Sequence, residues 1–485
     1  MARRSASAAS ATGKAARPPR RGEKTGASRP RPQGQERQPH RPVPDWQVAA
    51  ELFPPLDAAA QAALARLPEA LDRVRPLSAA HRRTLPEDIA ELSRVLTAER
   101  AELRRPYWSR PAFVSAYLHY FLPWNLVRLA RLFRGLPLPS PEGEGPALLL
   151  DAGSGPLTVP LALWLARPQW RGLAIQVLAL DSASQPLELG RALFAAWGEA
   201  LGEPVWPVRL AKGPLESLAA RAQPLLASGG RPWLITAANV LNEVRPTREG
   251  RGGRGGAVAE DGEDGEEDGG SGLLEEKLDK LLAAWSPLFA PTADAGVAGS
   301  EEGNLPALLF VEPGTRLGGT TLMRLRELAL AGGLHAVAPC TADTPCPLKR
   351  GAWCHFTFSP AGAPRWLAEL SGAAGLAKRS LSLSPLMLRA GAGGDTDAPP
   401  ASRARVLSSP FEVPGVCGLA RYACAPCGLA LLAEAGGIAS GSLVELGEAG
   451  TARPHGEKPR RDALSGARIF TPPQKQAPRG LKKKS

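Results

Sequence analysis

The sequence predicts an α/β fold in which a parallel sheet is covered by helices on both faces. Short apolar runs alternate with helical patterns between residues 146 and 314. The runs are apolar at nearly every position, which is typical of strands buried on both faces of a sheet. Two of them end in an aspartate where the chain turns toward a helix, Asp151 and Asp181. Such strand ends are the usual ligand-binding positions of α/β sheets.

The expected elements follow from the periodicity of the apolar residues. Residues 46–134 place apolar side chains every three or four positions, which predicts helices. Within them, residues 107–133 combine aromatics with arginines, and we expect an amphipathic helix packed on the next domain rather than a surface that stacks RNA bases. Strands are then expected at 146–155, 175–181, 233–244 and 305–314, and helices at 156–167, 187–201 and 273–288.

Charge and composition divide the chain into five parts. Residues 1–45 hold eleven Lys and Arg against three acids, and residues 452–485 hold ten against two. These tails lack the apolar residues that a core needs, which predicts disorder. The expected parts are a disordered basic tail (1–45), a helical N-terminal region (46–140), an α/β domain (141–330, with a disordered acidic insertion at 246–272), a cysteine-rich metal-binding region with the final strands of the sheet (331–440), and a second disordered basic tail (441–485).

The composition also bears on partners and location. No run of eighteen apolar residues predicts a membrane span, and no secretory signal is recognisable. Flexible polycations bind RNA phosphates, but the tails could equally serve only to keep the protein soluble. We expect an intracellular monomer with no membrane or DNA partner. The Ala, Gly, Pro and Arg bias favours a bacterial cytoplasm, and the mitochondrial matrix is the alternative.

The turn after the first strand has the composition of a cofactor site. Asp151 is followed by Gly153, Ser154 and Gly155, and glycines let the backbone turn tightly and approach a ligand. The helix that begins there presents unpaired N–H groups to an anionic group. Asp181 closes the next strand, where an acid accepts hydrogen bonds from ribose hydroxyls in nucleotide-binding folds. We therefore expect these five residues to bind a nucleotide-type cofactor.

The acid at the end of the first strand resembles that of class I methyltransferases rather than the GxGxxG motif of dinucleotide enzymes. The resemblance implies a Rossmann-like class I fold that binds S-adenosylmethionine, with Asp151 near its methionine end. Asn239, Asn242 and Glu243 lie where a strand of that fold delivers side chains to the reacting methyl group, so they are the candidate catalytic residues. Methyl transfer needs mainly alignment of the nucleophile and the sulfonium, and the sequence leaves catalysis itself open.

The cysteines form a second candidate site. All six lie after residue 339, at Cys340, Cys346, Cys354, Cys417, Cys424 and Cys427. In an intracellular protein this clustering favours metal binding over disulfides. The spacing of the first three differs from the paired CxxC knuckles of zinc ribbons. Three thiolates from one loop and a distant fourth suit an iron–sulfur cluster better, with zinc and unligated thiols as alternatives.

The fourth ligand is expected in the segment that contains Cys424 and Cys427, and Cys424 is preferred. His355, next to Cys354, is expected to pack beside the site rather than to bind the metal.

The motifs APC, PCPL and WCHF, together with DAGSGP, NVLNEV and FVEPGTRLGG, resemble the methyltransferase-like family of mitochondrial small-subunit ribosome assembly proteins and their bacterial relatives. The resemblance covers roughly residues 105–435. It implies a class I methyltransferase fold that binds S-adenosylmethionine, and association with small-subunit ribosomal RNA. It also implies a 4Fe–4S cluster in the C-terminal extension, held by Cys340, Cys346, Cys354 and Cys424.

Two functions therefore compete. The first is an S-adenosylmethionine-dependent methyltransferase that acts on the small ribosomal subunit or its RNA during assembly or translation. The second is a non-catalytic, RNA-binding assembly factor that keeps the methyltransferase fold, with zinc as the alternative metal. Both accept the basic tails, which can bind phosphates without reading sequence.

Overall fold

The computed structural model describes residues 46–97, 107–241, 268–289, 305–348, 351–391, 403–416, 418–447 and 460–471. All of these residues belong to one compact unit, Val43–Ser485. The predicted basic tail at 1–45 lies outside the described residues.

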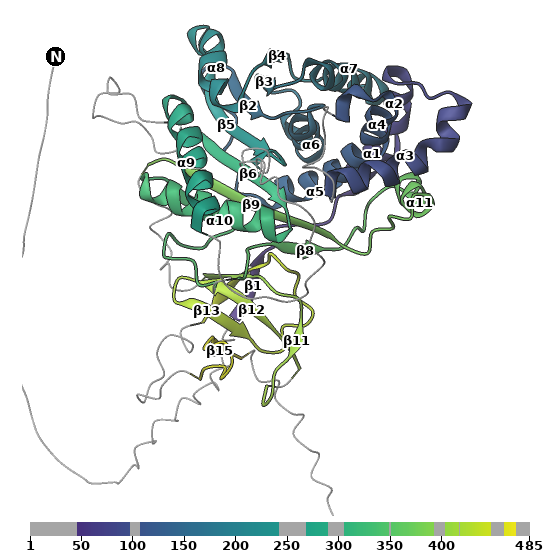
Figure 1. The fold of residues 1–485 in the computed structure, drawn as a ribbon. Coiled ribbons are helices and arrows are strands. Elements are labelled where there is room, and N and C mark those ends of the chain that lie inside the picture. Colours follow the sequence, from purple (N-terminus) through teal and green to yellow (C-terminus); the bar gives the residue numbers. More distant parts are fainter. Residues whose placement is uncertain are drawn as a thin grey trace, which may run out of the picture. The chain divides into compact units, whose positions relative to one another are not determined.

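The larger of two sheets contains the predicted parallel strands (Figure 1). Its strand order is β4-β3-β2-β5-β6-β9-β7, and β8 pairs with β9. The strands from β4 to β6 are mutually parallel, whereas β9 runs antiparallel to β6 and β7. The bounds are β2 (Ala147–Ala152), β3 (Ile175–Asp181), β4 (Val208–Lys212), β5 (Arg231–Ala238), β6 (Ala307–Pro313), β7 (His335–Ala338), β8 (Phe356–Phe358) and β9 (Leu381–Arg389).

Helices cover both faces of this sheet (Figure 1). In β2, Leu149 belongs to one hydrophobic core and its neighbours Leu148 and Leu150 belong to the other. Because both faces are covered, every position of the strand except Asp151 is apolar, as predicted. One face carries α5 (Leu122–Gly135), α6 (Thr158–Ala166) and α7 (Ser184–Leu201), and the other carries α8 (Leu218–Ala227), α9 (Asp268–Trp285) and α10 (Arg316–Ala331).

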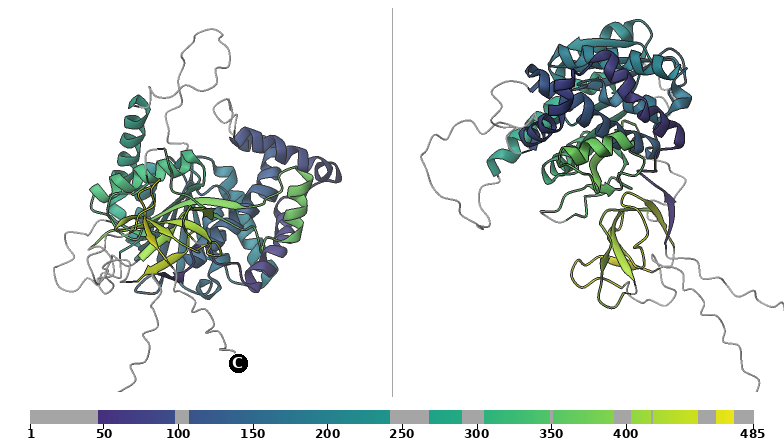
Figure 2. Two further views of the ribbon diagram at one scale, coloured as in Figure 1. Left: turned by 90° about the horizontal axis from the view of Figure 1, so that it is seen from below. Right: turned by 90° about the vertical axis from the view of Figure 1, so that its right-hand side faces the viewer.

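The N-terminal region is helical from Ala58 onward. Its elements are α1 (Ala58–Ala65), α2 (Leu67–Val74), α3 (Ala79–Thr97), a 3-10 turn η2 (Tyr107–Ser109), α4 (Pro111–Ala116) and a π-helical turn η3 (Tyr117–Phe121). Helix α3 contacts α11 (Arg365–Ala373), far along the chain, and the left view of Figure 2 shows the two side by side. The helix predicted over 107–133 is present from Pro111 to Gly135, where α4, the π-helical turn and α5 follow one another without a break; the π-helical turn is a bulge within it. The predicted packing role is confirmed, because Phe113, Tyr120 and Phe133 are buried.

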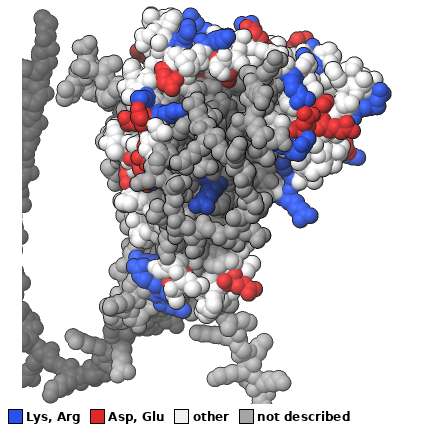
Figure 3. Space-filling view, in the orientation of Figure 1, with Lys and Arg blue, Asp and Glu red and all other residues white. Residues whose placement is uncertain are grey.

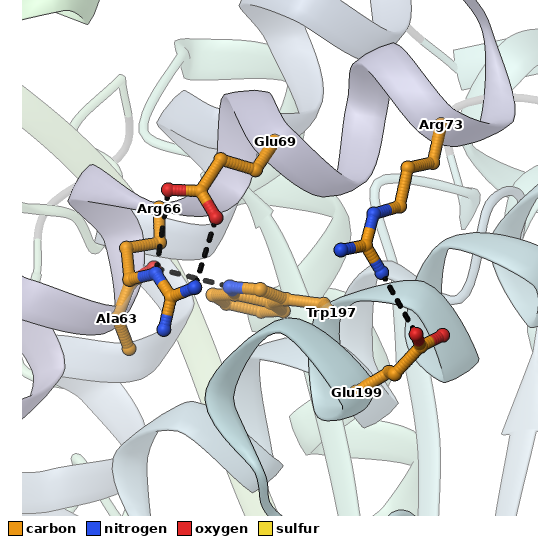
Figure 4. Close-up of polar contacts among 6 residues, drawn as sticks. All are labelled: Ala63, Arg66, Glu69, Arg73, Trp197 and Glu199. Atoms are coloured by element: carbon orange, nitrogen blue, oxygen red, sulfur yellow. Dashed lines mark hydrogen bonds and ion pairs between the residues drawn. The ribbon is translucent and has the colours of Figure 1, made fainter.

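Figure 4 shows how this region is fixed to the sheet domain. The buried Trp197 of α7 donates its indole N–H to the carbonyl of Ala63, at 3.0 Å. Arg73 pairs with Glu199 at 3.1 Å, but both side chains are exposed. Exposed ion pairs contribute little to stability, so buried side chains such as Trp197 stabilise this attachment more than the ion pair does.

A second sheet was not expected. Its strand order is β1-β14-β10-β12-β13-β15, with β11 paired to β12. All pairs in it are antiparallel except β13 with β15. The bounds are β1 (Trp46–Ala50), β10 (Arg403–Val406), β11 (Phe411–Glu412), β12 (Leu419–Ala425), β13 (Gly428–Leu432), β14 (Leu443–Leu446) and β15 (Arg468–Phe470).

This sheet corrects several predicted boundaries. The segment 46–140 begins with a strand rather than a helix, because β1 finds its partner in β14. Of the strands at 331–440, only β7, β8 and β9 join the main sheet. The disorder predicted for 441–485 does not hold for 441–447 and 460–471, which contain β14 and β15. The acidic insertion predicted at 246–272 ends earlier, since α9 begins at Asp268, and its residues up to 267 lie outside the described ranges.

Among the described helices, none combines the length and the apolar character that crossing a membrane requires.

Candidate functional site

The turn after β2 is hydrogen-bonded to the end of β3. The N–H groups of Gly153 and Ser154 donate to the carbonyl of Leu180, at 2.8 and 3.0 Å. The N–H of Gly155 donates to Asp181 Oδ2, at 2.9 Å. The predicted cofactor residues therefore lie together, at the carboxyl edge of two adjacent parallel strands.

Gly153 is required by both its conformation and its surroundings. Its φ is +70°, a left-handed value that favours glycine. A Cβ at this position would lie 2.6 Å from Cγ2 of Val240. Gly155 also has a positive φ, +52°, but a Cβ there would meet nothing within 4 Å among the described residues. The backbone at Gly155 is therefore open to a neighbouring group.

Asp151 is an unusually placed carboxyl group. It is buried, and its Oδ1 accepts a hydrogen bond from the Thr236 hydroxyl at 2.6 Å. Oδ2 is also buried and has no hydrogen-bond partner among the described residues. Burial raises the pKa of Asp151 to about 7, against the opposing effect of the nearby Ser154 and Thr236 hydroxyls. A buried carboxyl oxygen without a hydrogen-bond partner is a place where a donor group of a ligand would bind.

The candidate catalytic residues are placed only in part. Asn239 follows β5 with φ +58°, and its N–H donates to the carbonyl of Val311 at 2.8 Å. A left-handed asparagine at a strand end is a local strain that functional sites often contain. Asn242 and Glu243 lie outside the described residues.

Glu312 was missed by the sequence analysis. It lies near the end of β6, has no exposed surface, and its Oε1 accepts the N–H groups of Val240 and Leu241 at 3.0 and 2.9 Å. This carboxylate fixes the turn after β5, beside Gly153. The signal was present, because Glu312 ends an apolar strand in the same way as Asp151 and Asp181.

Four cysteines line a single cavity of about 40 Å³. They are the four predicted ligands, Cys340, Cys346, Cys354 and Cys424. Of the other two, Cys427 is exposed and is not among the described residues that line the cavity, and Cys417 lies outside the described ranges. Since about 10–15 Å³ suffices for one water molecule, the cavity has room for a larger group.

Three separate segments bring these thiols together. Cys340 and Cys346 lie in the loop after β7, Cys354 lies just before β8, and Cys424 lies in β12 of the second sheet. The Cys354 carbonyl accepts the Ser384 hydroxyl at 2.8 Å. A Cβ on Gly319 of α10 would lie 2.9 Å from that carbonyl, so this glycine permits the close approach.

The electrostatics of the cavity oppose free thiolates. Burial, with repulsion from Cys340 and Cys346, raises the pKa of Cys424 to about 12. Burial and the other three thiolates raise the pKa of Cys354 well above its ordinary value. These thiols therefore stay protonated unless a cation binds them, and a coordinating metal deprotonates a thiol outright.

The four thiols line one cavity, but the described residues do not form a tight ligand group there. In the described part of the chain, no three His, Cys, Asp or Glu side chains are grouped as the ligands of a metal ion would be. The four thiols thus share a cavity rather than a single point. His355 stacks on Trp353, with ring centroids 5.1 Å apart, and is not among the described cavity-lining residues, which agrees with the predicted packing role.

A family model described as mitochondrial small ribosomal subunit Rsm22 matches residues 301–366. These residues contain β6, α10, β7 and β8, and they include Glu312 and three of the cavity cysteines, Cys340, Cys346 and Cys354. The chain has no significant match among curated proteins.

Proposed function

We propose that the chain is an iron–sulfur protein with a class I methyltransferase fold that binds S-adenosylmethionine and acts on the small ribosomal subunit or its RNA. The observation that carries this proposal is the shared cavity of Cys340, Cys346, Cys354 and Cys424. Cysteines separated by up to 84 positions (424 less 340) line one space that has room for more than one water molecule. If these cysteines were simply buried thiols without a ligand, nothing would require them to line the same cavity.

The strand order supports the methyltransferase fold. The doubly wound order 3-2-1-4-5 is reproduced by β4-β3-β2-β5-β6, and the antiparallel β9 then lies between β6 and β7. This arrangement is compatible with the class I methyltransferase fold that the sequence resemblance implies. In doubly wound sheets the ligand binds where the strand order reverses, here between β2 and β3 on one side and β5 on the other.

The residues at this place fit S-adenosylmethionine. Asp181 would accept ribose hydroxyls, and the open backbone at Gly155 would lie against the ligand. The unpartnered Oδ2 of Asp151 would accept the donor groups of the methionine end. Asn239, held by the β6 backbone, would line the side from which a nucleophile approaches.

The cysteine cavity fits a 4Fe–4S cluster better than zinc. The spacing of the cysteines differs from the paired CxxC knuckles of structural zinc sites, and three thiolates from one loop with a distant fourth suit a cluster better. When bound, such a cluster would supply a clamp between chain segments rather than chemistry on a substrate. Cys340, Cys346 and Cys354 would hold it beside the main sheet, and Cys424 would hold it to the second sheet.

The ribosomal assignment rests on the matched family and on charge. The family description names the small ribosomal subunit of mitochondria. It therefore supports the mitochondrial matrix, and not the bacterial cytoplasm that the composition favoured. On the face shown in Figure 3, acidic and basic side chains of the described residues are interspersed. The basic excess lies in the terminal segments, which would bind RNA phosphates.

The cysteine assignment is tested by a matched pair of variants purified without oxygen. Cys424→Ser removes a cavity thiol, whereas Cys427→Ser removes an exposed thiol three residues away. We expect brown wild-type protein with iron and acid-labile sulfide, an unchanged Cys427→Ser variant, and loss of most iron in Cys424→Ser. Equal iron in the two variants, or a colourless zinc-containing wild type, would refute the assignment.

Cofactor binding is tested by titration calorimetry with S-adenosylmethionine. Asp181→Asn removes the charged acceptor and should weaken binding at least about tenfold, since hydrogen bonds to charged groups contribute about 1.5–3 kcal/mol. Glu188→Gln, an exposed acid on α7, serves as the control and should bind normally.

An assay of methyl transfer to small-subunit RNA then separates the two functions. Binding without transfer would identify the non-catalytic assembly factor.

A further inference from the structure

We infer that Arg326 is a positioning and charge-compensating residue of the cysteine cavity, and that it raises the reduction potential of the cluster held there. Because this inference rests on the proposed iron–sulfur function, its test must separate the failure of one from the failure of the other. No sequence motif singles out Arg326, which follows Arg324 on a helix with ordinary amphipathic spacing.

The side chain of Arg326 is fixed by three hydrogen bonds. It extends from α10, is 5% exposed, and lines the cavity. Its Nε donates to Cys340 Sγ at 3.1 Å. Its Nη2 donates to the carbonyls of Ala342 and Thr344, at 2.9 and 2.8 Å. The guanidinium therefore holds the loop between Cys340 and Cys346 and donates directly to one of the sulfurs.

A second buried arginine lines the same cavity. Arg405 is 7% exposed, and it donates to the carbonyls of Pro339 and Gly441, at 3.0 and 2.9 Å. Among the described residues, the hydrogen bonds of Arg326 and Arg405 go to the Cys340 sulfur and to backbone carbonyls, and none of them goes to a carboxylate. Burying an unpaired cation is costly, so two of them beside four thiols indicate that the cavity is built for an anionic group.

The charges agree with a thiolate-ligated cluster. Four thiolates around an oxidised 4Fe–4S core of charge 2+ have a net charge of about −2, which the two arginines offset. Reduction adds one electron from an external donor, with no bond broken and no proton moved, and the net charge becomes about −3. A nearby buried cation stabilises this added charge strongly, and an N–H···S hydrogen bond acts in the same direction. Removing Arg326 should therefore lower the potential.

The test is a potentiometric titration of the intact chain with dithionite as the one-electron donor, followed by electron paramagnetic resonance and visible absorbance. Arg326→Gln is compared with Arg324→Gln, which removes an exposed arginine two residues away on the same helix. We expect Arg326→Gln to shift the reduction equilibrium at least about tenfold toward the oxidised form, which is 59 mV for one electron. Arg324→Gln should match the wild type.

Each outcome has a distinct meaning. A wild type without an iron–sulfur spectrum overturns the proposed function itself. A cluster present in all three proteins at equal potentials overturns the role of Arg326 alone. If Arg326→Gln retains its fold but loses the cluster, Arg326→Lys decides. Retention of the cluster by the lysine variant supports charge compensation, and loss in both variants contradicts it, because the loop hydrogen bonds would then be the whole role.

Discussion

At the residue scale, Asp151 and Gly153 show how one turn combines two different constraints. Asp151 is a buried carboxyl group, with one oxygen hydrogen-bonded to Thr236 and the other without a partner among the described residues. Gly153 is a backbone position that no other residue can occupy without strain or collision. Both constraints concern the edge of the sheet where the ligand is proposed, and each leads to a separate prediction.

The first prediction concerns pH. Because the pKa of Asp151 is raised to about 7 in the folded chain, the native state binds this proton more tightly than the unfolded state does. The free energy of unfolding of the ligand-free protein should therefore fall as pH rises from about 4 toward 7, by up to about 1.4 kcal/mol per pH unit. Asp151→Asn cannot ionise and should flatten this decline. Urea unfolding at pH 5 and 7.5 measures it, and parallel profiles for the two proteins would contradict the assignment.

The second prediction concerns the turn glycine. Gly153→Ala should destabilise the protein more than Gly202→Ala, although φ is nearly the same at the two positions, +70° and +69°. A Cβ at Gly153 collides with Val240, whereas a Cβ at Gly202 meets nothing within 4 Å among the described residues. The difference should be about 1–3 kcal/mol, the usual cost of overpacking. Denaturant unfolding of both variants provides the comparison. Equal losses of unfolding free energy would contradict this prediction, because they would show that the Val240 side chain moves away from the new Cβ without a penalty.

The residues that the sequence identified differ in kind from those it missed. Clustered cysteines, and aspartates at the ends of apolar strands, are uncommon enough to be recognised from the neighbouring sequence alone. Arg326 and Arg405 were missed because arginine is common on helix and strand surfaces, and only the fold turns these two inward. Three of the four cavity cysteines could be grouped from their spacing in the sequence. Why Cys424 rather than Cys427 lines the cavity is explained only by the structure, in which Cys424 lies within β12, paired with Leu429 of β13, and Cys427 lies in the turn between the two strands.

At the scale of elements, the sequence predicted the buried parallel strands β2, β3, β5 and β6 well, but it did not locate the antiparallel β9, although most of that strand is buried. The strand at 175–181 has the predicted bounds, because its continuous apolar run marks it. The edge strand β4 was missed because Val208–Lys212 is not a continuous apolar run. Its residues alternate between half-buried and exposed for most of the strand, and two of them are basic. The second sheet was missed for another reason. Its pairs join β1 to β14 and β13 to β15, and such distant pairing leaves no local signal.

The element-scale prediction tests whether β15 is part of the fold. Phe470 has no exposed surface and belongs to the core of the second sheet. Phe470→Ala should cost about 3–5 kcal/mol of stability. Leu464→Ala is the control, because Leu464 is 86% exposed and its truncation should cost almost nothing. If the two variants have the same Tm, Phe470 contributes nothing to the fold, and the disorder predicted for this segment from its composition is correct.

At the scale of the whole molecule, the cysteine cavity connects the two sheets. Cys354 precedes β8 of the main sheet, Cys424 lies within β12 of the second, and Arg405 of β10 reaches across to the Pro339 carbonyl. A group bound to all four thiols would tie these segments together, and bound metals contribute their binding free energy to folding.

Removing iron should therefore loosen both sides of the cavity at once. Anaerobic chelation should raise amide hydrogen exchange in the loop around Cys340 and in β12 together, and lower the Tm. Strands β2 and β3, which contribute no residue to the described cavity lining, should keep their protection and serve as the internal control. Exchange that rises only in the loop would mean that Cys424 is not a ligand.

The most direct measurement of the central claim is native mass spectrometry of the chain purified without oxygen. We predict a single added mass equal to one 4Fe–4S core with the four bound thiols deprotonated, retained in Cys427→Ser and absent in Cys354→Ser. A chain with no added mass, or with the mass of a single zinc ion, would contradict the claim that these four thiols hold an iron–sulfur cluster.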